Sequence, residues 1–320
     1  MADKAFSVDF SVMASMMLTL FFLLLIGYIA RKVGLMDDKF SKQLSNLIIC
    51  VGQPFMIINA VTNVEYSTEN LKTAGIVLLL GLVIHGITAV VAHFATLPIK
   101  DKDEHAIFEY GLIFGNCGFM GFPILKSLLG DIGLFWGAFY VIAFNIIVWT
   151  YGMFVLSRAR SEIKMSVKGM ILNYGTTPCL IGLLIWVTQF KLPAPVLETA
   201  SYMGSICTPI SMLIVGALLA QIPLKDMFTN LKVYYSAFVR LLVNPLVVIL
   251  IGKLVGADRF LGEAFLVFAA VMASVPTAAN SAMFAERYDL LPVRAAHIVG
   301  ISTALSAVTI PLMILVVSII

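Results

Sequence analysis

Charged residues are scarce in this chain. Asp, Glu, Lys and Arg make up 12% of it, against roughly 25% in soluble domains, while hydrophobic residues make up 60%. So little charge excludes a large water-soluble domain. The composition therefore predicts an all-α polytopic membrane protein, whose charged residues are confined to the loops.

Catalytic and metal-binding patterns are also lacking. No H-E-x-x-H, G-x-S-x-G or G-x-x-x-x-G-K-[ST] motif occurs, so the sequence indicates no enzyme and no catalytic residue. The four cysteines lie in apolar runs without metal-ligand spacing, which argues against a metal site or a disulfide. No cofactor is expected, and no nucleic-acid partner, because the basic residues are spread over short loops.

Acidic residues are missing from the middle of every apolar run. Glu109, Glu198 and Glu263 are expected at the ends of runs, where water or a loop residue reaches them. A proton or sodium antiporter usually exposes an acidic ion site at mid-membrane. The absence of such a residue favours an anionic substrate over a cationic one.

Long apolar runs separated by short charged loops make up nearly all of the chain. The runs are 10–30, 43–64, 73–99, 110–125, 132–157, 169–190, 199–224, 233–252, 264–285 and 295–320. Almost all can span a hydrocarbon core of about 30 Å, so ten spans in a cell (plasma or inner) membrane are expected. Most Lys and Arg residues lie in loops after odd-numbered runs, which predicts that both termini are extracytoplasmic.

The run 110–125 is the shortest and the richest in helix breakers. It is bounded by Glu109 and Lys126, and its segment Gly115–Pro123 holds three glycines, an asparagine and a proline. A short apolar segment interrupted by Gly and Pro is typical of an unwound helix at a transporter's binding site. The alternative is a kink that only permits close helix packing.

The chain divides into two units with a common plan. The linker 158–168 separates a first five-span repeat, residues 1–157, from a second, residues 169–320. Matching features stand 153 to 155 residues apart: Pro54 with Pro209, Glu109 with Glu263, and Pro123 with Pro276. Because five is an odd number, the second unit is expected to insert in the opposite orientation, as an inverted repeat.

The counterpart of the broken segment is Ala273–Ser281 in the ninth run. If both spans break, they can cross at mid-membrane, and the N-terminal ends of the half-helices suit an anion. The predicted substrate-binding residues are Gln53, Asn116, Gly118, Pro123, Asn145, Arg240, Pro276, Thr277 and Asn280.

Two ionisable residues inside runs leave alternatives open. Arg240 either faces the cavity and neutralises a carboxylate substrate, or snorkels toward the headgroups near Lys232. His85 is a candidate proton relay, although a lone histidine among apolar residues is more often a packing residue.

Several motifs carry a resemblance to a known family. They are Gly27–Leu35 at the end of the first run, Pro54, Asn116 with Pro123, and Pro276 followed by Phe284–Tyr288. Together they resemble the auxin efflux carrier family, whose bacterial members include predicted malate and malonate permeases. The resemblance covers essentially the whole chain.

The resemblance implies a fold like that of sodium/proton antiporters and bile-acid symporters. Ten helices would form two inverted five-helix repeats, with broken helices 4 and 9 crossing. Helices 1, 2, 6 and 7 would form a scaffold and a homodimer interface, while helices 3–5 and 8–10 would form a transport domain that moves like an elevator.

The sequence therefore predicts a carrier of small organic anions, of the malate or malonate type, that works by secondary-active transport or uniport. One alternative is a proton- or sodium-coupled carrier of another small solute on the same fold. A remote alternative is a membrane sensor or an intramembrane enzyme.

Overall fold

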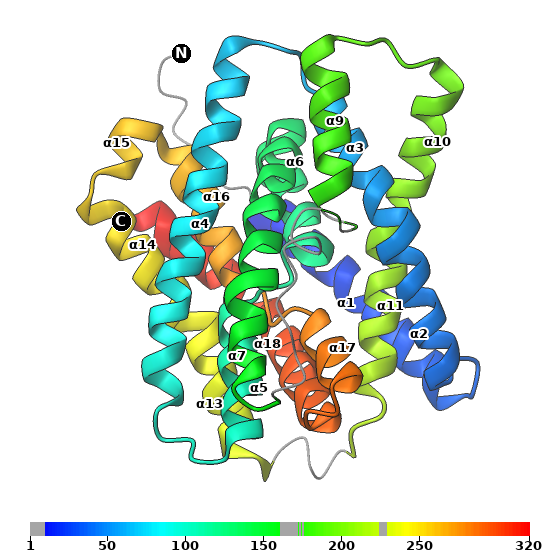
Figure 1. The fold of residues 1–320 in the computed structure, drawn as a ribbon, viewed down its shortest axis with the longest axis vertical. Coiled ribbons are helices and arrows are strands. Elements are labelled where there is room, and N and C mark those ends of the chain that lie inside the picture. Colours follow the sequence, from blue (N-terminus) through cyan, green and yellow to red (C-terminus); the bar gives the residue numbers. More distant parts are fainter. Residues whose placement is uncertain (1–9, 161–171, 173, 175, 224–228) are drawn as a thin grey trace.

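A computed structural model describes residues 10–160, 172, 174, 176–223 and 229–320. All regular secondary structure in these ranges is helical, as predicted, and most helices run roughly along the long axis of the molecule (Figure 1). The predicted linker 158–168 lies outside the described residues from position 161 onward. So does the start of the run 169–190, apart from residues 172 and 174.

The chain up to residue 160 begins with α1, which is followed by helices interrupted by short π-helical turns. These elements are α1 (Phe10–Lys32), α2 (Asp38–Leu47), η1 (Ile48–Gly52), α3 (Gln53–Thr62), α4 (Thr68–Thr96), α5 (Lys102–Ile113), η2 (Cys117–Gly121), α6 (Phe122–Ile147), η3 (Val148–Gly152) and α7 (Met153–Ser157). Within α6 the backbone turns at Gly130, whose φ is 65°.

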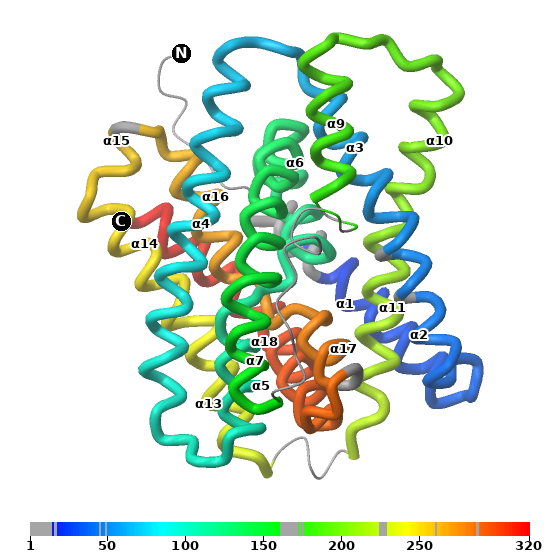
Figure 2. The backbone as a smooth tube through the Cα atoms, in the orientation of Figure 1, coloured from blue at the N-terminus to red at the C-terminus, as the bar shows by residue number. Residues whose placement is uncertain are grey.

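The remainder has the same character, and Figure 2 traces its path. Its elements are α9 (Thr176–Thr188), α10 (Ala194–Ser205), α11 (Cys207–Leu219), α13 (Leu231–Phe238), η4 (Val239–Val243), α14 (Asn244–Leu254), α15 (Ala257–Leu261), α16 (Glu263–Ser274), α17 (Asn280–Arg287) and α18 (Pro292–Ile319).

Among the described residues, five helical stretches are long and apolar enough to cross a membrane by themselves. They are Thr68–Thr96, Cys117–Ser157, Ala194–Leu219, Leu231–Leu254 and Pro292–Ile319. Shorter apolar helices occur at Cys50–Thr62, Thr176–Thr188 and Glu263–Ser274. The protein is therefore of the predicted polytopic membrane class, while ten spans in two inverted repeats stay a prediction.

Three prolines account for three of the π-helical turns. Pro54, Pro123 and Pro245 each lie two residues after such a turn, namely η1, η2 and η4. A proline has no N–H, and its ring clashes with the carbonyl four residues earlier, which lies inside the turn in all three cases. The helix therefore widens before each proline, and η4 carries Arg240 at this widened place.

The helices pack into two groups that are visible in Figure 1. On one side α1 packs on α11, and α3 packs on α9 and α10. The contact between α1 and α11 is so close that a Cβ on Gly27 or Gly216 would collide with a backbone oxygen of the other helix. On the other side α4, α5 and α6 pack together, as do α14, α16 and α18.

Two large hydrophobic cores lie among the described residues, beside a small cluster around Leu24 and Val215, and the chain passes between the two large cores several times. Phe114 belongs to one core and Cys117 to the other; likewise Ala278 belongs to the first and Val275 to the second. These two passages coincide with stretches where the helix is broken, between α5 and η2 and between α16 and α17, whereas α4 passes from one core to the other as a continuous helix. The two breaks thus occupy the junction of the cores.

Candidate functional site

The two broken segments cross each other, and their freed backbone groups pair. Gly115 and Thr277 form an isolated antiparallel bridge. The N–H of Asn116 donates to the carbonyl of Pro276 at 2.7 Å, and that of Ala278 donates to the carbonyl of Phe114 at 2.9 Å. These bonds explain how irregular backbone is tolerated in an apolar chain, because its polar groups are satisfied within the protein.

Arg240 closes the C-terminal side of the crossing. Only 2% of the residue is exposed. Its Nε donates to the carbonyl of Val275 at 3.0 Å, and its Nη1 donates to those of Leu112 at 3.2 Å and Ile113 at 3.4 Å. A helix C-terminus carries roughly half a negative charge, so one guanidinium compensates the ends of both α5 and α16.

The N-terminal ends of the resumed helices face a pocket instead. This pocket has a volume of about 180 Å³ and is lined by residues 115–119 at the start of η2 and by Ala278, Ala279 and Asn280 at the start of α17. Four carboxamides lie on its wall: Gln53, Asn116, Asn145 and Asn280. Five aromatic side chains join them: Phe119, Phe144, Trp149, Tyr174 and Phe284.

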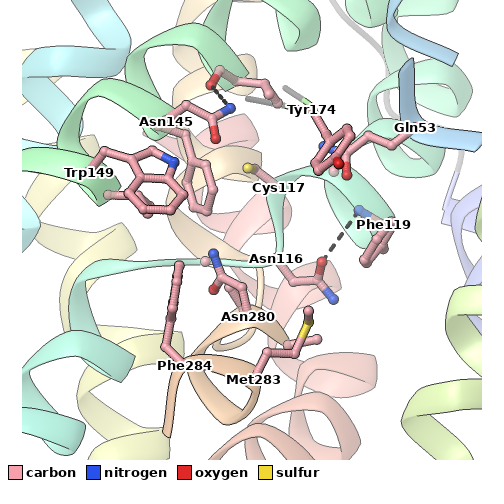
Figure 3. Close-up of a pocket in the computed structure, with 17 residues that line it drawn as sticks. Gln53, Asn116, Cys117, Phe119, Asn145, Trp149, Tyr174, Asn280, Met283 and Phe284 are labelled. Atoms are coloured by element: carbon pink, nitrogen blue, oxygen red, sulfur yellow. Dashed lines mark hydrogen bonds between the residues drawn. The ribbon is translucent and has the colours of Figure 1, made fainter. Parts of the chain in front are cut away.

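Asn116 carries an unpaired hydrogen-bond donor in the wall of this pocket. Its Oδ1 accepts from the N–H of Phe119 at 3.3 Å, which caps the resumed helix and fixes the orientation of the amide. Its Nδ2 is buried and has no partner among the described residues, although the residue is only 4% exposed. An unpaired buried donor is costly, so a ligand acceptor at this place would stabilise the protein. Figure 3 shows Asn116, Cys117 and Asn280 around the same space.

Five of the nine predicted substrate-binding residues line the pocket: Gln53, Asn116, Gly118, Asn145 and Asn280. The other four, Pro123, Arg240, Pro276 and Thr277, are not part of the pocket wall. Pro123 lies in the first turn of α6, and the carbonyl of Pro276 accepts from Asn116. The hydroxyl of Thr277 donates to the carbonyl of Gly111 at 3.0 Å.

Arg240 matches neither of the two interpretations left open by the sequence. It does not line the pocket, and its burial shows that it does not reach the headgroups near Lys232. Its bonding partners are backbone carbonyls distant in the sequence, which no sequence pattern reveals.

His85, the candidate proton relay, lies in α4 and is also absent from the pocket wall. Its Nδ1 lies 2.7 Å from the carbonyl oxygen of Gly81, and its ring packs against Tyr140 with 5.1 Å between ring centroids. It is 2% exposed, in the manner of a packing residue.

Glu109 corrects an expectation about the run 110–125. The helix does not begin there: α5 starts at Lys102, and Glu109 lies well inside it with 0% exposure. Its carboxylate accepts from Tyr151 Oη at 3.1 Å, bonds His105 Nε2 at 3.1 Å, and forms an ion pair with Arg158. Glu109 therefore does not mark the beginning of a helix. Its carboxylate is tolerated inside α5 because three side chains from the same part of the fold bond it.

The sequence did not predict the aromatic residues in the wall of the pocket. Trp149 lies next to Phe284, with ring centroids 5.8 Å apart and the rings nearly perpendicular. Their chemistry does not stand out among 22 phenylalanines and an apolar majority. The one available signal was the rarity of tryptophan, with three in the chain.

Residues 12–314 match the family model described as "Membrane transport protein". The chain belongs to this family. It is the auxin efflux carrier family, so the resemblance seen in the sequence motifs is confirmed.

Two archaeal relatives are similar over nearly their whole length. One is an uncharacterised transporter of Methanocaldococcus jannaschii, 23% identical over 297 residues, which are 91% of this chain and 94% of that protein. The other is an uncharacterised transporter of Methanothermobacter thermautotrophicus, 23% identical over 300 residues, which are 92% of this chain and 95% of that protein.

Proposed function

We propose that this membrane transport protein carries a small organic anion, a carboxylate of the malate or malonate type, through the pocket at the helix crossing. One observation carries the proposal. Two helix N-termini, at Cys117 and Asn280, open into the pocket with their partial positive charge, whereas both C-termini are compensated by Arg240. The uncompensated charge in the pocket is therefore positive.

The chemistry of the wall supports a small substrate with few charges. The volume of about 180 Å³ lies below the roughly 300–1,000 Å³ of sites for drug-sized ligands. Among the described residues of the wall none carries a charge at neutral pH, so helix N-termini and carboxamides such as Asn116 meet the anion. This arrangement binds one carboxylate group of a substrate directly, and it binds a second carboxylate group of the same substrate less well.

The proposed mechanism is alternating access by elevator-type motion. The scaffold consists of α1, α2, α3, α9, α10 and α11, and the remaining helices form the transport domain. The packing of α1 on α11, and of α3 on α9 and α10, supports this division. Exposed apolar residues on α1, among them Phe22 and Ile26, provide a surface for lipid or for a second scaffold in a homodimer.

The driving force follows from the charge of the substrate. A potential of 100 mV, negative inside, opposes the entry of each negative charge by about 2.3 kcal/mol. Efflux of an anion can proceed as uniport. Uptake of a dianion needs a co-transported cation or an exchanged anion, and a proton- or sodium-coupled carrier is the alternative on the same fold.

A thermal-shift screen of the purified protein against organic acids tests the proposal. A ligand that binds the folded state stabilises it by about 2.7 kcal/mol at a hundred times its dissociation constant. We expect a mono- or dicarboxylate to raise the melting temperature in proportion to the logarithm of its concentration. If neutral or cationic solutes raise it and no carboxylate does, the substrate class is wrong.

A further inference from the structure

The π-helical turn η3 differs from the turns that precede a proline. It ends at Gly152 and runs directly into Met153 and Phe154, so no proline accounts for its widening. A π-helical turn inside an α-helix is rare and occurs frequently at functional sites. η3 carries Trp149, which lines the pocket at the crossing. The wall formed by the end of α6 and by η3 is therefore a second place to look for substrate recognition.

The carboxamide of Asn145, on this wall, has a fixed orientation. Its Nδ2 donates to the carbonyl of Val141 at 2.8 Å, one turn earlier on α6. A carbonyl oxygen only accepts hydrogen bonds, so the NH₂ group must face it and Oδ1 must point the other way. Figure 3 shows this oxygen on the side of the amide that faces Cys117 and Trp149. Asn145 thus presents an acceptor to the pocket.

The indole of Trp149 presents a donor beside this acceptor. An indole nitrogen donates one hydrogen bond and accepts none. Trp149 follows Asn145 by four residues, a spacing that places two side chains on one face of a helix, and both residues line the pocket. Figure 3 shows the indole nitrogen on the edge of the ring nearest Asn145. Among the described residues, neither this nitrogen nor the Oδ1 of Asn145 has a hydrogen-bond partner.

A donor next to an acceptor matches a hydroxyl group. A hydroxyl donates one hydrogen bond and accepts others, so it can satisfy Asn145 and Trp149 together. An ionised carboxylate only accepts, and its oxygens would repel the Oδ1 of Asn145. A methylene group satisfies neither residue and leaves both polar groups unpaired in an apolar surrounding, which is costly.

The pocket therefore has two ends of different chemistry. The helix N-termini at Cys117 and Asn280 suit a carboxylate, while Asn145 and Trp149 suit a hydroxyl. All four residues line the same cavity of about 180 Å³, so one small molecule can reach both ends.

We propose that Asn145 and Trp149 form a hydroxyl subsite, and that the pocket selects hydroxycarboxylates over the same acids without the hydroxyl group. The inference rests on the proposed function, because it assumes a carboxylate at the helix crossing. It adds two specificity-determining residues and narrows the substrate class. Malate carries a hydroxyl group and malonate does not, so malate is the better substrate of the two.

Isothermal titration of the purified protein with matched pairs of acids tests the subsite. L-malate is compared with succinate, and L-lactate with propionate, since the members of each pair differ by one hydroxyl group. We expect the dissociation constant of each hydroxy acid to be lower by about tenfold, because its partner leaves a donor and an acceptor unpaired. Equal constants within both pairs would overturn the inference.

Two variants assign the selectivity to its residues. Asn145→Leu removes the acceptor, and Trp149→Phe removes the donor while it keeps an aromatic ring against Phe284. Each variant should weaken the binding of L-malate more than that of succinate, so that the ratio of the two constants falls toward one. A ratio as large as that of the parent in Trp149→Phe, with or without a folded Asn145→Leu, would remove the indole from the subsite and overturn the proposal.

The matched controls make the same changes outside the pocket. Asn59→Leu alters α3, and Trp136→Phe alters α6, and neither residue lines the pocket. Both variants should keep the selectivity of the parent. If they lose it to the same extent as the pocket variants, the selectivity does not arise from Asn145 and Trp149.

The outcomes separate this inference from the proposed function. If L-malate and succinate bind equally well, the hydroxyl subsite fails and the carboxylate site stands. If no carboxylate binds, but 1,2-propanediol, the uncharged analogue of lactate, binds in a way that requires Asn145 and Trp149, the subsite stands and the proposed substrate class fails.

Discussion

Gly115 packs directly against the guanidinium group of Arg240, so closely that a Cβ at position 115 would collide with Nη2. The two residues belong to different halves of the chain, and together they build the closed side of the crossing. The bare Cα of Gly115 lets the guanidinium reach the carbonyls of Leu112 and Val275.

The first prediction concerns the space at Gly115. Gly115→Ala should displace Arg240 and destabilise the protein by about 1–3 kcal/mol, because it overpacks a well-filled interior. The measurement is thermal unfolding of the purified variant. Gly86→Ala is the matched control, since a Cβ at Gly86 in α4 meets nothing within 4 Å. That variant should be neutral or slightly stabilised, because alanine favours a helix.

The second prediction concerns the charge of Arg240. Arg240→Gln cannot reach all three carbonyls, and each buried acceptor left unpaired costs about 1–3 kcal/mol. We expect a large drop in melting temperature and in the yield of folded protein. Arg259→Gln, at an exposed position on α15, should behave like the parent. An Arg240→Gln variant as stable as Arg259→Gln would mean that the helix ends need no compensation.

The third prediction separates the two roles of Asn116. Asn116→Asp keeps an oxygen that caps η2 but replaces the unpaired donor with a negative charge in the pocket. Stability should be retained, while anion binding and transport should be lost. Asn116→Ala and Asn280→Ala should also lose transport. Binding by isothermal titration, with Asn59→Ala outside the pocket as the control, checks these outcomes. Normal transport in all three pocket variants would reduce the asparagines to packing residues.

The fourth prediction concerns the buried carboxylate of Glu109. Glu109→Gln removes the charge that Arg158 pairs with, and it leaves one amide to serve Tyr151 and His105. We expect destabilisation of about 1–3 kcal/mol, moderated by the partial exposure of Arg158. Chemical denaturation in detergent measures it, and the exposed Glu198→Gln provides the reference. Equal stability of the two variants would show that the cluster around Glu109 is not structural.

Local sequence signals predicted the breaks in the helices but not what lies beside them. Gly115, Pro123 and Pro276 predict an interrupted helix, because the backbone preferences of glycine and proline are local properties. The partners of Arg240 are carbonyls at Leu112 and Val275, which every residue possesses, so no residue pattern encodes them.

Two further differences have physical reasons. Glu109 was expected at the end of a run because charges are costly in lipid, yet a carboxylate with three partners is tolerated in the interior. Trp149 and Phe284 contribute to the pocket through tertiary packing between α17 and η3, and hydrophobicity alone does not distinguish a wall residue from a core residue.

Counterflow in proteoliposomes tests the central claim most directly. Vesicles with the purified protein are loaded with unlabelled malonate or malate, diluted into buffer, and given a trace of the labelled acid outside. The account predicts a transient accumulation of label with the parent protein and none with Asn116→Asp, although both proteins are folded to the same extent. Failure of the parent to move any carboxylate in either direction, or equal accumulation with Asn116→Asp, would contradict an anion site at the crossing.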